Sequence, residues 1–436
     1  MKIVYVGDNR NRENYGCRAT STALSQLISQ EHEIVGRVYG NYRNIDTKKI
    51  FYCPLFGKKV YSFLSRRRYW RYFRELFICI IHIIKRNRVS LSSFDVFSYD
   101  YEKNIKKIKK SMCVNEILKE CDLTQYDFDA LVINGEGSFI FSKVPWRESV
   151  VEATLMYWAK KMGKKVYFMN AMFSGKPGEK LNLTSVNKVK PIMESIECVC
   201  VREYQSLAFA KKYFPKANIQ LFPDALFTWY EMINDGHMIK DGKYYMGFRG
   251  AYDQTFKEFD FDQKYVCVSA SSSERIFEDI IKTKEVYCNL IKKIKEMTDY
   301  KVYIVHVCDG DDFLLDVAKV TNTSVVPIDT PILAAGKILA NAELYITGRY
   351  HPAILASLGG TPCVFMGSNS HKTKSLQELL GYEDVIEYDV LPDENEIDKI
   401  ILSGKHKLEL GIELRNTIKS KANDLSEKSK KMANIL

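Results

Sequence analysis

The sequence contains no CxxC pair. Its 436 residues include 11 cysteines, but none has the spacing that is typical of zinc sites and redox motifs. The chain opens on MKIVYVGD, which is typical of a strand rather than of a charged leader before an apolar stretch, so we expect no secretion signal. We therefore predict free thiols in a reducing cytoplasm, with Cys200, Cys267 and Cys363 buried in strands.

Long apolar runs, internal repeats and low-complexity segments are absent as well. The run LFICIIHII has nine residues, fewer than the roughly 20 that a helix needs to span a bilayer. Hydrophobic residues make up 46% of the chain and aromatic residues 12%, which is enough for packed cores and excludes wholesale disorder. A chain of this length is expected to form two domains of roughly 200 residues each.

Excess positive charge is lacking everywhere except in one segment. Residues 58–90 hold ten Lys/Arg against one acid, Glu75, and so carry +9 of the total charge of +10. The rest of the chain is close to neutral, and the excess therefore needs a local explanation.

Residues 62–88 of this segment combine arginines and aromatic residues with an apolar stripe at helical spacing. Three interpretations are open: contact with an anionic membrane surface, a core-packed helix with a solvated basic side, or nucleic-acid binding. We favour the membrane contact and expect no nucleic-acid binding, because no binding fold is evident elsewhere. The predicted location is cytoplasmic, with peripheral attachment to the inner face of the cytoplasmic membrane.

Strand-like apolar runs alternate with amphipathic helices along the chain, which predicts an α/β fold with two Rossmann-like parallel-sheet domains. In such sheets ligands bind at the carboxyl ends of the strands. The predicted divisions are an N-terminal domain that carries the basic insert, a connector, a C-terminal domain and a C-terminal helix. They span residues 1–230, 231–262, 263–410 and 411–436, respectively.

Basic residues follow two of the predicted strands in the C-terminal half. Arg349 and His351 open a helix in GRYHPAILASLGG, and Lys372 follows the strand CVFM. A helix N-terminus with an arginine is a candidate anion site, and a histidine beside it can transfer protons. The competing interpretations are a surface arginine with a capping histidine, and an ordinary loop lysine.

Polar residues after strands of the N-terminal half are candidates for binding a second substrate. Glu136 lies between two glycines in NGEGSF and is either an acid/base group or a loop glutamate that pairs with a basic neighbour. Asp8, Asn14 and Asn170 are further candidates for binding this second substrate. Asp224 is expected to cap backbone at the domain junction.

A metal ion is not expected. Asp309, Asp311 and Asp312 lie close together in sequence, but they lack the spaced pattern of a dedicated cation cage. We predict a surface acidic loop.

Several motifs together resemble the polysaccharide pyruvyl transferase family. The C-terminal motif is Arg-x-His followed by spaced Ala, Gly and Pro and then a Lys. Three earlier stretches also resemble motifs of the family and occur in the same order along the chain, namely VINGEGSF, VREYQSLAFAKK and FPDALF. The resemblance extends over roughly residues 1–382, without the basic insert. The residues of the C-terminal motif are Arg349, His351, Ala356, Gly360, Pro362, Lys372 and Gly381.

The resemblance implies a two-domain fold like that of GT-B glycosyltransferases, with a cleft between the domains. It implies transfer of the pyruvyl group of phosphoenolpyruvate to two hydroxyls of one sugar, giving a cyclic ketal and phosphate, with no cofactor. By the resemblance, Arg202, Arg349 and Lys372 would bind phosphoenolpyruvate, and Arg349 and His351 would be catalytic. Glu136 is a further catalytic or acceptor-binding candidate because of its position after a strand, not because of the resemblance. The acceptor would be a nascent bacterial surface polysaccharide or a lipid-linked oligosaccharide.

Two other functions are open. A GT-B-type glycosyltransferase with a nucleotide-sugar donor would need an acid for the ribose, and none lies beside residues 367–374. A non-catalytic scaffold is disfavoured because clustered cations facing a cleft are costly without a ligand.

Overall fold

The computed structural model describes residues 1–40, 97–111, 116–235, 242–244, 254–256 and 259–436. The basic segment 58–90 lies outside the described residues, so its membrane interpretation stays a prediction. No helix in the described ranges is both long and apolar enough to cross a membrane. The chain divides into two compact units. The first unit comprises residues 1–9 and 28–221, and the second comprises residues 10–27 and 222–435.

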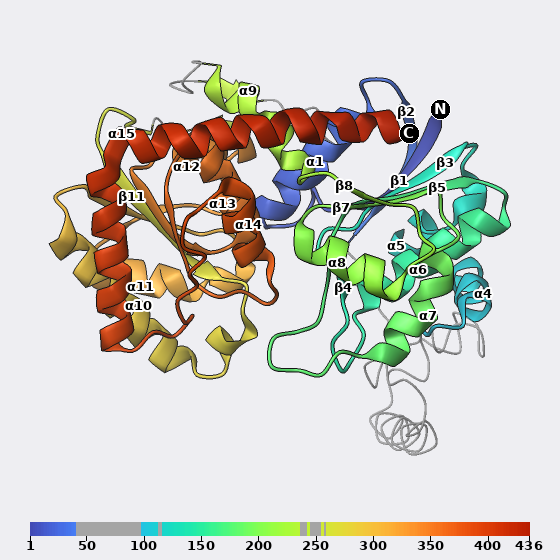
Figure 1. The fold of residues 1–436 in the computed structure, drawn as a ribbon, viewed down its shortest axis with the longest axis horizontal. Coiled ribbons are helices and arrows are strands. Elements are labelled where there is room, and N and C mark those ends of the chain that lie inside the picture. Colours follow the sequence, from blue (N-terminus) through green and yellow to red (C-terminus); the bar gives the residue numbers. More distant parts are fainter. Residues whose placement is uncertain (41–96, 112–115, 236–241, 245–253, 257–258) are drawn as a thin grey trace, which may run out of the picture. The chain divides into compact units, whose positions relative to one another are not determined.

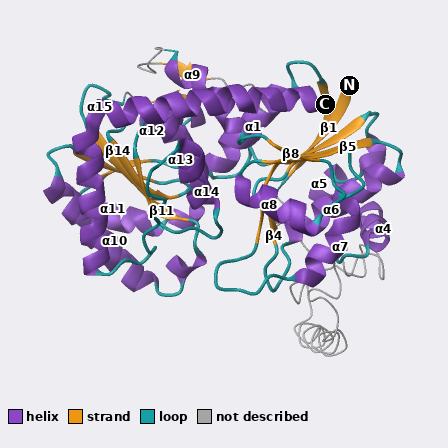
Figure 2. Ribbon diagram, viewed as in Figure 1, coloured by secondary structure: helices purple, strands orange, loops and turns teal. Residues whose placement is uncertain are grey.

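The first unit is built on a six-stranded parallel sheet in the order β2-β1-β3-β5-β7-β8. Its central strands β1, β3, β5 and β7 are buried along almost their whole length, which is typical of parallel strands in α/β sheets. Figure 2 shows the helices α5, α6 and α7 of the same unit beside this sheet. A short parallel pair, β4 and β6, lies outside the main sheet. The strands are β1 (Lys2–Asp8), β2 (Glu33–Tyr39), β3 (Ala130–Asn134), β4 (Phe139–Ile140), β5 (Lys165–Ala171), β6 (Phe173–Ser174), β7 (Cys198–Val201) and β8 (Ile219–Leu221).

Five α-helices and one 3-10 helix complete the described part of the first unit. Buried aliphatic and aromatic residues of α6 pack with those of the strands in one core. The helices are α4 (Tyr101–Ser111), α5 (Glu116–Glu120), η2 (Leu123–Gln125), α6 (Arg147–Lys161), α7 (Leu183–Met193) and α8 (Tyr204–Tyr213).

The second unit contains a five-stranded parallel sheet in the order β13-β12-β11-β14-β15. An antiparallel pair, β9 and β10, precedes it in the chain. The two parallel sheets confirm the predicted α/β fold class. The strands are β9 (Gly242–Tyr244), β10 (Gln254–Phe256), β11 (Tyr265–Ser271), β12 (Lys301–Val305), β13 (Ser324–Val326), β14 (Leu344–Gly348) and β15 (Cys363–Phe365).

Helices of the second unit connect these strands and end in α15, the long red helix of Figure 1. The α-helices are α1 (Tyr15–Ile28), α9 (Tyr230–Asn234), α10 (Ile280–Met297), α11 (Phe313–Thr321), α12 (Ile332–Ala340), α13 (Tyr350–Leu358), α14 (Lys372–Leu380) and α15 (Glu394–Lys430). The 3-10 helices are η3 (Ala225–Trp229), η4 (Glu274–Phe277), η5 (Asp309–Asp311) and η6 (Lys431–Ile435).

The helix α15 begins well before residue 411 and bends there, where Gly411 has a φ of 53°. Beyond the bend it buries Ile418, Ala422 and Leu425. This part of the helix therefore packs one apolar face within the fold while its Lys/Glu side stays exposed.

The helix α1 is joined to the second unit by hydrogen bonds along its length. The backbone N–H of Tyr15 donates to Val307 O at 3.0 Å. One turn later, Arg18 Nη1 donates to Thr330 O at 3.3 Å. Near the far end, Trp229 Nε1 donates to Gln26 Oε1 at 2.8 Å. These contacts explain why residues 10–27 group with the second unit although they follow β1 directly in the chain.

Candidate active site

Arg349 occupies the N-cap position of α13, directly after β14. Its backbone N–H donates to Thr347 Oγ1 at 2.9 Å, and its guanidinium pairs with Asp311 in η5. The Asp311 side chain is fully buried, and that of Arg349 is 12% exposed. Burial by itself lowers the pKa of Arg349, but the neighbouring Asp311 carboxylate more than compensates, so the net shift is upward and the guanidinium stays charged.

The buried position of Asp311 corrects the prediction of a surface acidic loop. The sequence shows three nearby acids, but it does not show that a guanidinium 38 residues later supplies a counter-charge. Asp312 pairs instead with His306, whose Nε2 lies 3.0 Å from Asp312 Oδ1. Across the described ranges, no group of three or more His, Cys, Asp or Glu side chains is placed to hold a metal ion.

The Arg349 guanidinium keeps one donor available. Its buried Nε makes no hydrogen bond within the part of the chain that the structure describes. A buried donor of this kind is costly unless a ligand or water accepts from it. The same position lies at the start of α13, where backbone N–H groups and the helix dipole favour an anion.

His351 lies in the first turn of α13 and faces a buried carboxylate. Its Nε2 is 3.3 Å from Asp224 Oδ2, and its side chain is 13% exposed. Asp224 Oδ1 accepts hydrogen bonds from Thr20 Oγ1 at 2.8 Å and from the backbone N–H of Leu226 at 3.0 Å. Asp224 therefore caps η3, as expected, and also contacts His351, a pairing that no local sequence pattern indicates.

The first turn of α1 lies against the same imidazole. A side-chain carbon added at Gly16 would be 2.6 Å from His351 Nδ1 and 3.0 Å from its Cβ. Only glycine allows the helix backbone to approach the ring this closely. No local pattern marks Gly16, because it stands in a polar stretch, GDNRNRENYG, that is typical of a loop, whereas α1 already begins at Tyr15.

Lys372 is the first residue of α14, which follows β15. Its Nζ donates to Asn369 Oδ1 at 2.7 Å. Because β14 and β15 are adjacent and parallel, Arg349 and Lys372 both follow the carboxyl ends of neighbouring strands. The loop between β15 and α14 is joined to the end of β11, because Ser271 Oγ donates a hydrogen bond to Gly367 O.

A second polar centre lies in the first unit, around Glu136. Glu136 Oε1 accepts hydrogen bonds from Asn9 Nδ2 at 2.8 Å and from Asn134 Nδ2 at 2.9 Å. Asn170 Nδ2 donates in turn to Asn134 Oδ1 at 3.4 Å. Glu136 and Asn170 both have positive φ, 36° and 56°. Strained backbone of this kind in non-glycine residues often marks functional sites.

The acceptor-side residues predicted from the sequence are divided between the two units. Asp8 lies at the end of β1 in the first unit and accepts from Arg37 at 3.0 Å. Glu136 and Asn170 are linked there through Asn134. Asn134 and Asn9 were not among the predicted residues, because no pattern in the sequence indicates that their side chains bind Glu136. Asn14 belongs to the second unit, where its Oδ1 accepts from the backbone N–H of Cys17 at 3.2 Å.

Arg202 lies in the first unit, one residue after β7. It is 1% exposed, and its Nη2 lies 3.9 Å from Met172 Sδ. The following Glu203 caps α8 by accepting from the backbone N–H of Ser206 at 2.9 Å. Within the Val-Arg-Glu motif, Glu203 thus caps the start of α8, and Arg202 directly before it is buried.

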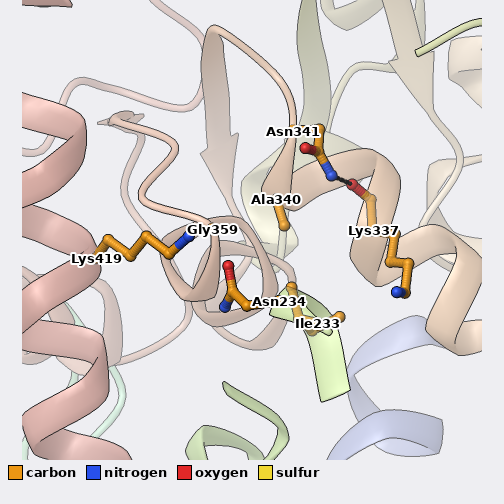
Figure 3. Close-up of a pocket in the computed structure, with 7 residues that line it drawn as sticks. All are labelled: Ile233, Asn234, Lys337, Ala340, Asn341, Gly359 and Lys419. Carbon is orange, nitrogen blue, oxygen red and sulfur yellow. Dashed lines mark hydrogen bonds between the residues drawn. The ribbon is translucent and has the colours of Figure 1, made fainter. Parts of the chain in front are cut away.

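A pocket of about 160 Å³ lies elsewhere in the second unit (Figure 3). The carboxyl ends of α9, α12 and α13 converge on it, and Lys419 of α15 points toward Gly359. Lys337 is held by Asp235 at 2.6 Å, and Asn341 Nδ2 donates to Lys337 O at 2.8 Å. The lysines complement the negative ends of these helices. Its lining residues are Ile233, Asn234, Lys337, Ala340, Asn341, Gly359 and Lys419.

Solved structures with a similar fold include three bacterial proteins. UDP-N-acetylglucosamine 2-epimerase from Rickettsia bellii matches with a TM-score of 0.53 at 12% identity, covering 100% of this chain and 95% of that one. The S. aureus MnaA–UDP structure matches with a TM-score of 0.51 at 11% identity and coverage of 98% and 94%. UDP-GlcNAc 2-epimerase from Neisseria meningitidis, bound to UDP-GlcNAc, matches with a TM-score of 0.50 at 10% identity, covering 100% of this chain and 98% of that one.

At these identities the likeness shows the fold alone, which is the GT-B fold with parallel sheets in two domains. No curated protein sequence matches the chain significantly. A sequence model of one family, the polysaccharide pyruvyl transferases, matches residues 14–370. The matched region contains Glu136, Arg202, Arg349 and His351. The chain therefore belongs to the polysaccharide pyruvyl transferase family.

Proposed function

We propose that the protein transfers the pyruvyl group of phosphoenolpyruvate to two hydroxyls of one sugar. The acceptor in this proposal is a nascent bacterial surface polysaccharide or a lipid-linked oligosaccharide. The products are a cyclic ketal and phosphate. The observation that carries the proposal is the placement of Arg349 and His351 together at the start of α13 in a chain of this family.

Phosphoenolpyruvate presents a phosphate and a carboxylate close together, so its site needs several donors. Arg349 offers the unbonded Nε–H, and its guanidinium is held by Asp311. The first-turn N–H groups of α13 add donors at the same place. Arg202 and Lys372 are further cations in the proposal, because an arginine fork suits carboxylate and phosphate alike.

The reaction requires proton transfers at three places. A proton adds to the methylene carbon of phosphoenolpyruvate, C2 becomes electrophilic, and one sugar hydroxyl adds there. Phosphate then leaves, and the second hydroxyl closes the ring. Of the two hydroxyl protons, one balances the proton taken up by the methylene carbon and the other leaves with phosphate. His351 and Glu136 are suited to these transfers, an effect worth ~10²–10⁴ in rate.

The acceptor is assigned to the polar centre of the first unit. Carboxamide and carboxylate groups such as those of Asn9, Glu136 and Asn170 match the hydroxyl pattern of a sugar, since they offer both donors and acceptors. Glu136 accepts two hydrogen bonds already, which holds its carboxylate in one orientation. Asp8 and Asn14 are further proposed contacts.

The test is incubation of the purified protein with phosphoenolpyruvate and a panel of lipid-linked saccharides. We expect phosphate release together with a mass gain of one pyruvate less one water on one acceptor. Mass gain of a whole sugar from a nucleotide-sugar donor, with none from phosphoenolpyruvate, would instead identify a glycosyltransferase.

A thermal-shift comparison separates the same alternatives without an acceptor. A ligand at 100 times its dissociation constant stabilises the folded state by about 2.7 kcal/mol. We expect phosphoenolpyruvate to raise the melting temperature and UDP or UDP-sugars to leave it unchanged. The reverse result would contradict the proposed donor.

A further inference from the structure

The two oxygens of Asp224 face different partners. Oδ1 accepts from two donors, Thr20 Oγ1 at 2.8 Å and the Leu226 N–H at 3.0 Å. Oδ2 faces His351 Nε2 at 3.3 Å. The Asp224 side chain is fully buried, and Thr20 is buried too. The carboxylate is therefore fixed in rotation, with one oxygen directed at the imidazole.

A carboxylate can only accept hydrogen bonds, so a bond with Nε2 requires the proton to be on Nε2. In a neutral imidazole the other nitrogen, Nδ1, then carries the lone pair. We infer that Asp224 fixes His351 as the Nε2–H tautomer and thereby makes Nδ1 the atom that exchanges protons with substrate. The second half of this inference rests on the proposed function, whereas the tautomer does not. Asp224 acts in it as a positioning residue.

The helix α1 supports this arrangement from one face. Gly16 and Thr20 are four residues apart, so they lie on the same side of the helix. Gly16 lies beside Nδ1, where an added carbon would be 2.6 Å away, and Thr20 holds the carboxylate that faces Nε2. One helical face thus carries the hydroxyl that holds Asp224 and, at Gly16, the glycine that leaves open the space beside Nδ1 which a side chain would fill.

The decisive variant is Asp224→Asn. The Asn carbonyl oxygen is required at the Oδ1 position, because the Leu226 N–H can only donate and Thr20 donates there as well. The amide NH₂ must then face His351 Nε2, which has to accept. We expect the tautomer to change from Nε2–H to Nδ1–H, with the capping of η3 retained.

Nitrogen NMR of the full chain with ¹⁵N-labelled histidine measures this directly, since protonated and unprotonated ring nitrogens resonate far apart. Spectra are taken above the range in which imidazoles titrate, and the His351 signal is identified by its loss in His351→Gln. The unmodified protein should show Nε2 protonated. An Nδ1–H tautomer there would overturn the inference, even if the variant fails to fold.

His306 and Asp312 provide a matched control in the same unit. His306 Nε2 lies 3.0 Å from Asp312 Oδ1, so this is a second imidazole–carboxylate pair. Asp224→Asn should move only the His351 signals, and Asp312→Asn only those of His306. A change at both histidines in either variant would indicate a general structural effect and contradict the specific assignment.

Kinetics then separate the inference from the proposed function. With phosphoenolpyruvate, Asp224→Asn should lower kcat by at least tenfold and change KM little, because the donor contacts of Arg349 are untouched. A larger effect on KM than on kcat would overturn the positioning role. If the tautomer is as inferred but phosphoenolpyruvate gives no phosphate, the proposed function fails and the Asp224 assignment stands.

Discussion

At the scale of single residues, the side chains of His351 and Arg349 differ in the contacts that hold them. The imidazole is held by Asp224 and the α1 backbone, while the guanidinium is neutralised by Asp311 and still keeps a donor unbonded. A histidine suits proton transfer and an arginine suits anion binding. Their substitution should therefore affect different kinetic quantities.

His351→Ala should reduce turnover with phosphoenolpyruvate at least tenfold, because a positioned proton-transfer group is lost. Donor binding, measured by calorimetry, should remain. His406, which is exposed on α15, provides the control, and His406→Ala should leave turnover unchanged. Normal turnover in His351→Ala with the fold intact would contradict the assignment.

Asp311→Ala should lower the free energy of unfolding by about 3–5 kcal/mol, because it leaves the Arg349 guanidinium buried without a counter-charge. Urea denaturation measures the change. The double variant Asp311→Ala with Arg349→Met should lose less than the single variant, since no lone charge remains. Equal stability of Asp311→Ala and the unmodified protein would mean that the pair does not form.

At the scale of elements, helix ends and glycines decide where side chains can be placed. The starts of α13 and α14 follow adjacent parallel strands, so their N-terminal residues come to one sheet edge. The end of α13 meets the end of α12 so closely that only a glycine fits there, because a side-chain carbon at Gly359 would be 2.1 Å from Ala340 O.

Gly359→Ala should therefore destabilise the second unit by about 1–3 kcal/mol, the usual range for overpacking. The φ of Gly359 is −92°, which alanine adopts freely, so the steric clash is the cause. Gly367→Ala is the matched control, because its added carbon makes only ordinary contacts at 3.7 and 3.8 Å. Thermal unfolding followed by circular dichroism should show a lower melting temperature for Gly359→Ala alone.

Gly16→Ala in α1 should lower activity and, to a smaller degree, stability. The added carbon would lie 2.6 Å from His351 Nδ1, so the ring has to move, and overpacking of this kind costs about 1–3 kcal/mol. We expect phosphate release from phosphoenolpyruvate to fall at least tenfold in a protein that still folds with a lower melting temperature. Unchanged activity would show that the ring tolerates the displacement.

At the scale of the whole molecule, the second unit is made from two separate stretches of chain. The domain boundaries predicted at residues 230 and 262 follow chain order, whereas the contacts group residues 10–27 with 222–435. The strand β1 stays in the first unit while α1, which follows it, joins the second.

A fragment of residues 222–436 should therefore be much less stable than the same region in the full chain. It would lack the partners of Val307 O, Thr330 O and Asp224 Oδ1, all of which bond to α1. Circular dichroism and urea titration should show a lower midpoint or a poorly folded fragment. Addition of a peptide of residues 10–28 should restore stability in part, and a fragment as stable as the full chain would contradict this division.

The sequence by itself determined the fold class and the family. Strand and helix runs alternate with recognisable periods, and the Arg349–His351 motif is a local pattern, so both could be read without coordinates. Whether the acidic loop is exposed or buried could not be predicted from the sequence, and the prediction that it lies on the surface was wrong for Asp311.

Only the tertiary structure decided what surrounds the motif. Asp311 reaches Arg349 across 38 residues, Asp224 faces His351 across 127, and Thr20 holds Asp224 across 204. No local pattern encodes such pairs. Asp311 and Arg349 meet because β12 and β14 are parallel strands of one sheet whose carboxyl ends lie at the same edge. The pairs of Asp224 with His351 and Thr20 depend instead on how α1, η3 and α13 pack, and burial requires each of these polar groups to have a partner. The residues with chemistry were visible in the sequence, and their orientation was set by the fold.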